Sequence, residues 1–313
     1  MVETTLSPPF APDAEYFAGL ARMSDLTTPL WGETFRRCEQ FSNRFLEASA
    51  EWSSPDYPWR IDPLHCWSRL WEYPFALAAI EGRSVDGPTR IVDVGAGANF
   101  FGLLLAHLGY SIEAVDGDNA VVAAGRRLAD FARARLGVAA GSLSFLHGDA
   151  RELPVPDASA DVVQCISVIE HVPEAQEIVP ELARVLRPGG TLVLTFDLAL
   201  AGQDGLDVDA LQNVLHAVGR YFEITTPEAR TVFEETRHLS DILTNFTSPA
   251  DIRSRERLGP RHCIREVEHW PPLQADWWRP ISTRRALAAA TARKQPLLAL
   301  YAVKARKRRT PLS

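Results

Sequence analysis

Cysteine is scarce in this sequence, and the cysteines it has are not spaced as metal ligands. The chain contains four cysteines among 313 residues, and no two of them form a Cys-x-x-Cys pair. His262 and Cys263 are adjacent, but no second pair of possible ligands lies near them. Because zinc sites usually repeat such pairs, the sequence predicts no metal site. A reducing cytoplasm is the expected location.

The sequence also lacks long apolar runs and an excess of positive charge. No apolar stretch is as long as a membrane span, and the opening MVETTLSPPFAPDAEY has neither the basic start nor the apolar core of a signal peptide. The net charge is −7, so the chain has no overall electrostatic footprint for nucleic acid. The basic cluster at Lys304–Arg309 is better explained as a solvated tail than as an RNA-binding patch. We therefore expect no membrane and no nucleic-acid partner.

What the sequence does contain is a regular alternation of strand and helix signals in its middle third. The expected strands are 90–95, 111–117, 143–149, 160–168 and 191–197. The expected helices are 100–109, 120–137 and 173–190. This alternation is typical of a parallel sheet with helices on both faces.

The two flanks differ from this middle part. Residues 1–85 are rich in aromatic residues and proline, with helical periodicity over 34–49 and again from Asp62. The segment 201–290 is mixed, and 296–307 is an apolar run suited to a late strand. We divide the chain into an N-terminal helical cap (1–85), an alternating core (86–200), a substrate-side insertion (201–290), and a last strand with a basic tail (291–313).

Two glycines follow the first expected strand directly, in IVDVGAGANF. Gly95 and Gly97 place a loop at the carboxyl end of this strand, where ligands bind in open α/β sheets. The alternative is a tight turn without a ligand. A dinucleotide fingerprint would need glycine at position 100, which is Phe100. Asp116 ends the second strand and could accept hydrogen bonds from both ribose hydroxyls, as a nicotinamide enzyme would also require.

Several segments together resemble the successive motifs of class I S-adenosylmethionine-dependent methyltransferases that act on small molecules. They are IVDVGAGANFFG, AVDGD, FLHGDARELPVPDASADVVQCISVIEHV and LARVLRPGGTLVLTF. Their order and spacing match from about 89 to 197, and LLALYAVKA is similar to the family's last strand. The resemblance implies an α/β fold with a Rossmann-like, doubly wound, mostly parallel seven-stranded sheet, a helical N-terminal cap and a C-terminal insertion. Asn99 departs from the usual third glycine, but asparagine tolerates left-handed dihedrals.

The resemblance also implies which residues bind S-adenosyl-L-methionine and its product, S-adenosyl-L-homocysteine. The methionine half would be lined by Asp93, Gly95, Ala96, Gly97, Ile166 and Ser167. The ribose would be held by Asp116, and the adenine by Gly117, Asp118, Asp149 and Ala150. For Asp149 the alternative is a helix or turn cap. No metal is implied.

His171, in IEHV just past the fourth strand, is the candidate proton acceptor. Methyl transfer places a nucleophile in line with the methyl carbon, and a base is needed only if that nucleophile arrives protonated. The alternative for His171 is a packing or capping role. His65 and His238 are weaker candidates.

The aromatic segment 66–80, CWSRLWEYPFALAAI, precedes the first core strand and could form a lid over the cofactor. It would contribute Trp71, Glu72 or Tyr73, and we place Tyr73 among the cofactor-binding residues. Pro74 should kink or end this helix. The alternative is ordinary core packing.

The expected acceptor is a small organic molecule. The sequence after the fourth strand, CISVIEHV, lacks the Asn/Asp-Pro-Pro-Tyr motif of enzymes that methylate base amines. Oxygen is the first choice of methyl-accepting atom, and nitrogen or carbon the second. The alternatives are a non-catalytic S-adenosylmethionine-binding protein and a nicotinamide-dependent oxidoreductase. A monomer or a homodimer is expected.

Overall fold

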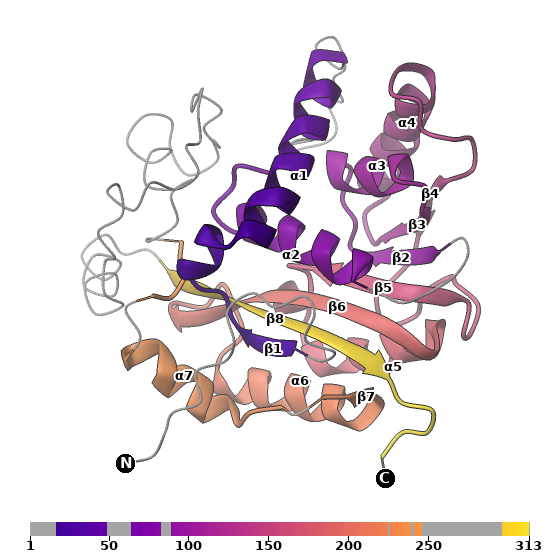
Figure 1. The fold of residues 1–313 in the computed structure, drawn as a ribbon. Helices are drawn as coiled ribbons and strands as arrows, with labels where there is room; N and C mark the ends of the chain where they lie inside the picture. The colour runs from indigo at the N-terminus through magenta and orange to yellow at the C-terminus, as the bar shows by residue number, and fades with distance from the viewer. Residues whose placement is uncertain are drawn as a thin grey trace.

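A mixed sheet forms the centre of the structure, a computed structural model that describes residues 17–48, 64–82, 89–224, 226–238, 241–245 and 296–312 (Figure 1). Its strand order is β1-β8-β6-β5-β2-β3-β4, and β7 also pairs with β8. The strands are β1 (Phe17–Leu20), β2 (Arg90–Val94), β3 (Ser111–Asp116), β4 (Leu143–His147), β5 (Ala160–Ile166), β6 (Leu186–Ala201), β7 (Phe222–Glu223) and β8 (Leu297–Lys307). The pairs within β6-β5-β2-β3-β4 are parallel, whereas β8 is antiparallel to β6, β1 and β7.

The predicted fold class is confirmed, with one difference in the number of strands. The sheet has eight strands among the described residues instead of seven. Two strands, β7 and β1, were not among the six segments expected to be strands, and β1 lies in the region predicted to be a helical cap. It pairs with β8 over Phe17↔Lys304 to Leu20↔Tyr301. The N-terminal region therefore contributes to the sheet as well as to a helical layer.

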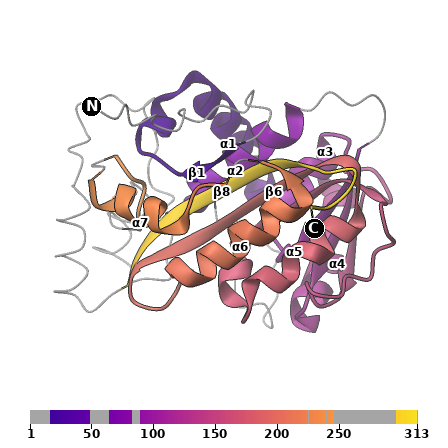
Figure 2. The ribbon, with the colours of Figure 1, turned by 90° about the horizontal axis from the view of Figure 1, so that it is seen from below.

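Helices cover both faces of the sheet (Figures 1 and 2). The helices on one face are α1 (Pro29–Ala48), α2 (Arg69–Glu81), α3 (Phe100–His107) and α4 (Asn119–Arg135). Those on the other face are α5 (Ile178–Val185), α6 (Val208–Tyr221) and α7 (Ala229–His238). Short 3-10 helices occur at η1 (Ser24–Thr27), η2 (Ile169–His171) and η3 (Ala175–Glu177). Side chains that alternate along each strand supply two cores, an upper core on the α1–α4 face and a lower core on the α5–α7 face.

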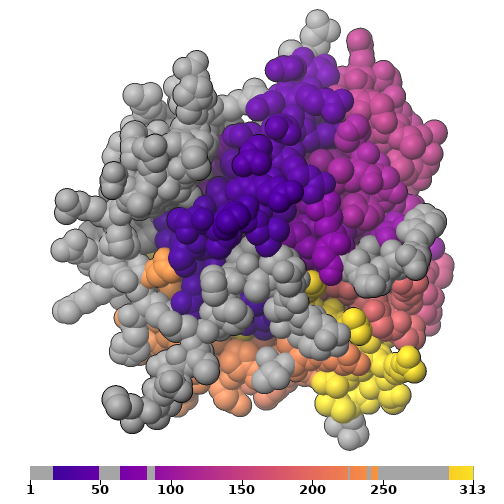
Figure 3. Space-filling model, viewed as in Figure 1, coloured from indigo at the N-terminus to yellow at the C-terminus, as the bar shows by residue number. Residues whose placement is uncertain are grey.

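Helix α2 is the inner layer on its face, and α1 packs outside it. All residues from Leu70 to Ile80 are buried, while α1 forms a ridge on the surface in the space-filling view (Figure 3). The two helices are joined by a buried hydrogen bond, in which Trp31 Nε1 donates to the Leu70 carbonyl oxygen at 3.0 Å. Trp71 Nε1 donates to Asp25 Oδ2 at 2.9 Å. Core packing, the alternative to a lid, thus accounts for Trp71.

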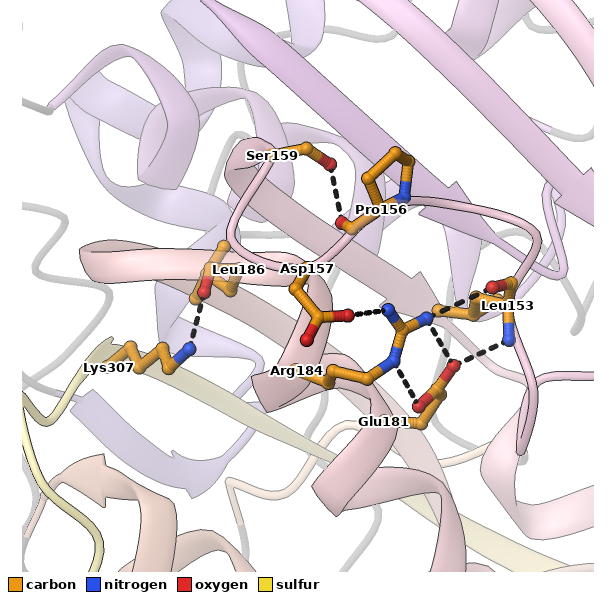
Figure 4. Close-up of polar contacts among 8 residues, drawn as sticks. All are labelled: Leu153, Pro156, Asp157, Ser159, Glu181, Arg184, Leu186 and Lys307. Atoms are coloured by element: carbon orange, nitrogen blue, oxygen red, sulfur yellow. Dashed lines mark hydrogen bonds and ion pairs between the residues drawn. The ribbon is translucent and has the colours of Figure 1, made fainter.

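A polar cluster around Arg184 of α5 fixes the segment between β4 and β5 (Figure 4). Arg184 Nη2 donates to the Leu153 carbonyl oxygen at 3.0 Å, and Nη1 is bonded to Asp157. Arg184 Nε and Nη2 donate to the Glu181 carboxylate at 2.8 and 2.6 Å, respectively. Glu181 in turn accepts a bond from the Leu153 amide at 2.6 Å. The segment that begins at Asp149 is therefore anchored to α5.

Part of the insertion predicted at 201–290 lies beyond the described residues. Residues 246–290 are outside the described part of the chain, and Trp270, Trp277 and Trp278 are among them. In the residues that the structure describes, no helix is long and apolar enough to cross a membrane.

Candidate functional site

The loop after β2 is shaped by two glycines with left-handed backbones. Gly95 has φ +68° and Gly97 has φ +58°, values that favour glycine because it lacks a Cβ. Asn99 is extended at φ −140° and caps α3, since its Oδ1 accepts from the Phe101 amide at 2.9 Å. Its Nδ2 donates to the Ala96 carbonyl oxygen at 2.9 Å. Asn99 thus acts through capping, and the left-handed conformation that asparagine tolerates is not used.

Gly95 also lies against the chain that leaves β5. A Cβ on Gly95 would be 2.3 Å from Cγ2 of Val168, closer than carbon atoms can approach without a shift. The Val168 side chain therefore packs directly against the Gly95 backbone and leaves no room for a side chain at position 95.

Asp116 ties this loop to the start of α4. Its Oδ2 accepts from the Gly97 amide at 3.1 Å, and its Oδ1 accepts from the Asp118 amide at 3.0 Å. Asp118 itself caps α4 through the Ala120 amide at 2.7 Å. A carboxylate offers about four acceptor positions, so two of those on Asp116 are not used by these bonds. Gly117 and Asp118 beside it are exposed.

Asp93 lies deeper, on β2 beside Gln164 of β5. It is 7% exposed, and burial raises the pKa of its carboxyl to about 7, with a further rise from Asp116 and a partial offset from Gln164. The Asp93 carboxyl therefore holds its proton to higher pH than an ordinary aspartate does.

Asp149 follows β4 at the same edge and is paired with Arg151. Its Oδ1 accepts from the Arg151 amide at 2.8 Å and from Nε at 3.0 Å, while Oδ2 accepts from Nη2 at 2.7 Å. These bonds lower the pKa of Asp149 to about 2. Asp149 thus caps the turn, which was the alternative to adenine binding. Its carboxylate is also exposed and can be reached by a ligand. Ala150 is partly buried against the lower core.

The start of α2 lies over the end of β5 and the part of β6 that pairs with it. Glu72 is completely buried, and its Oε1 accepts from Ser167 Oγ at 2.7 Å and from Thr195 Oγ1 at 2.5 Å. Arg69 forms an ion pair with Glu72 and donates to Ser167 Oγ at 2.7 Å. Ser167 has a left-handed backbone, φ +49°, and its amide donates to the Thr195 carbonyl oxygen at 2.9 Å. Residues of α2 thus hold Ser167 in a strained conformation.

Two further carboxyls, which the sequence motifs did not indicate, lie beside this network. Glu170 is in η2 and Asp197 is on β6, where the Asp197 amide donates to Glu170 Oε1 at 3.2 Å. Burial raises the pKa of Glu170 to about 8 and that of Asp197 well above its usual range, and the Arg69 guanidinium only partly offsets both. The signal for Glu170 is present in IEHV, directly before His171.

His171 lies at the surface at the end of η2. Its amide donates to the Val168 carbonyl oxygen at 3.0 Å. Partial desolvation and the Arg69 charge lower the pKa of its imidazole, and Asp204 opposes this shift. A neutral imidazole at pH 7 can accept a proton.

The other predicted residues are placed as follows. Ile166 ends β5 and packs on the upper core. Tyr73 is 4% exposed and stacks on Phe101 with a ring separation of 4.3 Å, so it fills the core between α2 and α3. His65 is buried against Phe35 with a ring separation of 6.0 Å. The side chain of His238 lies outside the described part of the chain.

The topology brings most of the predicted site to one edge of the sheet. The carboxyl ends of β5, β2, β3 and β4 are neighbours, and they carry, in that order, Ser167, Gly95, Asp116 and Asp149. In open α/β sheets this edge is where ligands bind.

Comparison with known proteins agrees with this arrangement. Residues 92–194 match a family described as a methyltransferase domain. These residues are a methyltransferase domain. The predicted resemblance to S-adenosylmethionine-dependent methyltransferases is confirmed for this core.

Curated relatives share only part of their length with the chain. It is 46% identical over 66 residues to 27-O-demethylrifamycin SV methyltransferase of Amycolatopsis mediterranei, which is 21% of this chain and 24% of that protein. It is 36% identical over 117 residues to demethylmenaquinone methyltransferase of Deinococcus radiodurans, which is 37% of this chain and 46% of that protein. The chain therefore spans less than half the length of each of these two relatives.

Among solved structures, the fold is similar to that of an arsenic(III) S-adenosylmethionine methyltransferase from Chlamydomonas reinhardtii. The TM-score is 0.41 at 16% identity, with 71% of this chain and 64% of that chain covered.

Gly95→Ala is expected to lower the free energy of unfolding by about 1–3 kcal/mol more than Gly137→Ala, because overpacking adds to the backbone strain. Gly137 is a matched control, since it has φ +70° but no atom within 4 Å of the position that a Cβ would occupy. Urea unfolding measures both, and Val168→Ala should restore part of the loss at Gly95. Equal losses for the two glycines would show that only strain matters.

The buried Glu170 carboxyl should make the protein less stable as pH rises. Its pKa is about 8 in the folded chain against about 4.3 when unfolded, so between these values the folded state holds a proton that the unfolded state has lost. Folding is then favoured at the acid end, and the contribution is lost as pH rises to about 8.

Glu170→Gln should remove the Glu170 contribution to this pH dependence. The unfolding free energy of the variant relative to the native protein should rise between about pH 5 and pH 8, as measured by urea unfolding. Glu177→Gln, at an exposed position on η3, is the control. Parallel pH profiles for the native protein and Glu170→Gln would contradict the burial of this carboxyl.

Proposed function

We propose that this chain is an S-adenosylmethionine-dependent methyltransferase that acts on a small organic acceptor. The observation that supports it most is the joining of Gly97 and Asp118 amides to one carboxylate, Asp116, at the edge of a methyltransferase domain. This geometry leaves acceptor positions on Asp116 for the ribose hydroxyls, and the glycine loop lets the backbone come close to the donor.

The residues present fit this donor. The glycine loop at Gly95–Gly97 and the end of β5 at Ser167 would hold its methionine half. Asp116 would bind the ribose, and Asp149 with Ala150 would lie by the adenine. When bound, S-adenosylmethionine supplies an electrophilic methyl group on a sulfonium. The chain's own task is then to position the acceptor and exclude water.

Oxygen remains the preferred methyl-accepting atom. The name of the rifamycin relative describes methylation at an oxygen, which supports this choice. A hydroxyl acceptor must lose a proton as its oxygen forms the new bond to carbon. His171 is the proposed acceptor of that proton, because its lowered pKa keeps the imidazole neutral at pH 7.

The cofactor choice can be tested by titrating the purified chain with S-adenosylmethionine and, separately, with NADH. We expect a heat of binding for the first and none for the second. Incubation with S-adenosylmethionine that carries a deuterated methyl group, followed by mass spectrometry of acceptor mixtures, then detects transfer. Binding of S-adenosylmethionine without a labelled product from any mixture would favour the non-catalytic alternative, and binding of NADH alone would favour the oxidoreductase.

Asp116→Ala should weaken the binding of S-adenosylmethionine by about 2–3 kcal/mol, the scale of losing hydrogen bonds to a charged group. Calorimetry measures the dissociation constant, and circular dichroism confirms that the variant is folded. Asp130→Ala is the control, because Asp130 lies on α4 in a surface ion pair with Arg133. An unchanged dissociation constant for Asp116→Ala would remove this residue from the ribose role.

A further inference from the structure

Three carboxyls and one guanidinium gather beneath α2, at the end of β5 and the adjoining part of β6. Glu72 and Arg69 come from α2, Glu170 from η2 and Asp197 from β6. The group lies next to the cofactor loop, because Val168, between Ser167 and Glu170, packs against Gly95. It therefore borders the region where an acceptor has to meet the methyl donor.

If all three carboxyls were ionised, the single guanidinium could not balance their charges within the described residues. Arg69 is paired with Glu72 and also bonded to Ser167. It acts on Glu170 and Asp197 only as a nearby charge. Two carboxyls thus share the field of one cation that is already engaged by a third.

Two carboxyl oxygens in this group are buried without a hydrogen-bond partner among the described residues. They are Glu170 Oε2 and Asp197 Oδ1. Because the Asp197 amide bonds to Glu170, the two unsatisfied oxygens come from residues in direct contact. Folded proteins rarely leave such atoms unpaired, and two of them on residues in contact indicate a missing donor.

We propose that Glu170 and Asp197 form an acceptor subsite that binds a protonated amine carried by the methyl acceptor. The proposal rests on the methyltransferase function proposed above and narrows its substrate class. An ammonium group has several N–H donors and a positive charge, so it can donate to carboxyl oxygens and replace the charge of a displaced carboxyl proton. A hydroxyl group has a single donor and no charge. The methyl-accepting oxygen would then belong to an amine-bearing molecule.

Arg69 and Glu72 act as positioning residues for this subsite. Their ion pair uses the guanidinium and keeps it from neutralising Glu170 and Asp197 directly. In the free protein the raised pKa values keep protons on these two carboxyls. On binding, the ammonium takes the place of one carboxyl proton, which leaves to solvent, so the net charge of the group is unchanged.

A metal ion fits this group less well than an amine. Within the described residues, no set of three or more histidine, cysteine, aspartate or glutamate side chains has the arrangement needed to hold a metal. The third carboxylate, Glu72, is already occupied by Ser167 and Thr195. Magnesium is therefore a competing occupant to be tested.

The test compares three probes with one ring and different charge, namely 2-phenylethylamine, 2-phenylethanol and 3-phenylpropionic acid. Each is titrated into the full chain saturated with S-adenosylhomocysteine, and binding is measured by ligand-observed NMR. The amine should bind about tenfold or more tightly than the alcohol, as expected for a charge-assisted hydrogen bond. The acid should bind most weakly.

The variant Glu170→Gln/Asp197→Asn should reduce the amine preference to about threefold or less. Amides resemble protonated carboxyls in shape, so the variant is expected to fold and to bind S-adenosylhomocysteine as the native chain does. Glu177→Gln, on η3, is the matched control and should keep the full preference. Calorimetry of the native chain in two buffers of different ionisation enthalpy should also show proton release on amine binding near pH 7.

Several results would overturn the proposal. They are equal binding of amine and alcohol, no binding of the amine, an unchanged preference in the double variant, and saturable binding of Mg²⁺ that is lost in that variant. If the variant does not fold, the probe series and the proton release of the native chain decide alone. Failure of S-adenosylhomocysteine to bind would instead contradict the proposed function. A titration of the chain with S-adenosylhomocysteine, made before the probes are added, shows which of the two proposals has failed.

Discussion

The buried carboxylate of Glu72 is the constraint on which the functional edge of the sheet depends. A buried charge must be paired and hydrogen-bonded, and Glu72 meets this need with Arg69, Ser167 and Thr195. Helix α2 is buried on all sides, so an apolar stripe cannot decide which side faces the sheet. The bonds of Glu72 can make that choice, because only one rotation of the helix brings its carboxylate to Ser167 and Thr195.

The same bonds carry the effect of α2 into the loop after β2. Ser167 is held in a left-handed conformation that costs free energy in a residue with a side chain. This turn directs the chain so that Val168 meets Gly95, where any larger residue would collide. The N-terminal helices are thus mechanically connected to the glycine loop, although more than 20 residues separate Glu72 from Gly95 in sequence.

Much of the core could be predicted because its signals are local. Strand β2, helix α3, strand β3 and helix α4 lie within two residues of their predicted limits, since each has its own apolar period and its own cap. Strand β6 is longer than predicted. The predicted strand began only at 191, because Pro188 and Gly189 usually interrupt regular structure. In the structure these residues fall in a register shift between Ala160↔Leu186 and Val162↔Thr191, where a strand tolerates them.

What the sequence did not indicate depends on contacts between distant residues. The short segment FAGL of β1 has a weak strand signal, and its partner β8 is more than 270 residues away. The site shows the same limit. Gly95, Gly97 and Asp116 were found because each lies in a short contiguous motif, whereas the protonation of Glu170 and Asp197 is set by their burial in the folded chain. In IEHV, histidine was chosen as the candidate base because of its residue type. The neighbouring Glu170 was passed over, because a short motif does not show how deeply a carboxyl is buried.

The helical cap predicted for residues 1–85 must also be understood differently in physical terms. Trp31 bonds to Leu70, β1 pairs with β8, and Phe45 is fully buried in the same core as Ile91. Removing everything before Asp86 would therefore expose the upper core and break an edge of the sheet, so loss of activity in such a fragment would say nothing about a cap. Changes confined to Arg69 and Glu72 address the same question without opening the core. If this region serves the acceptor, it does so from inside the fold, through polar side chains that an otherwise apolar helix carries to the end of the sheet.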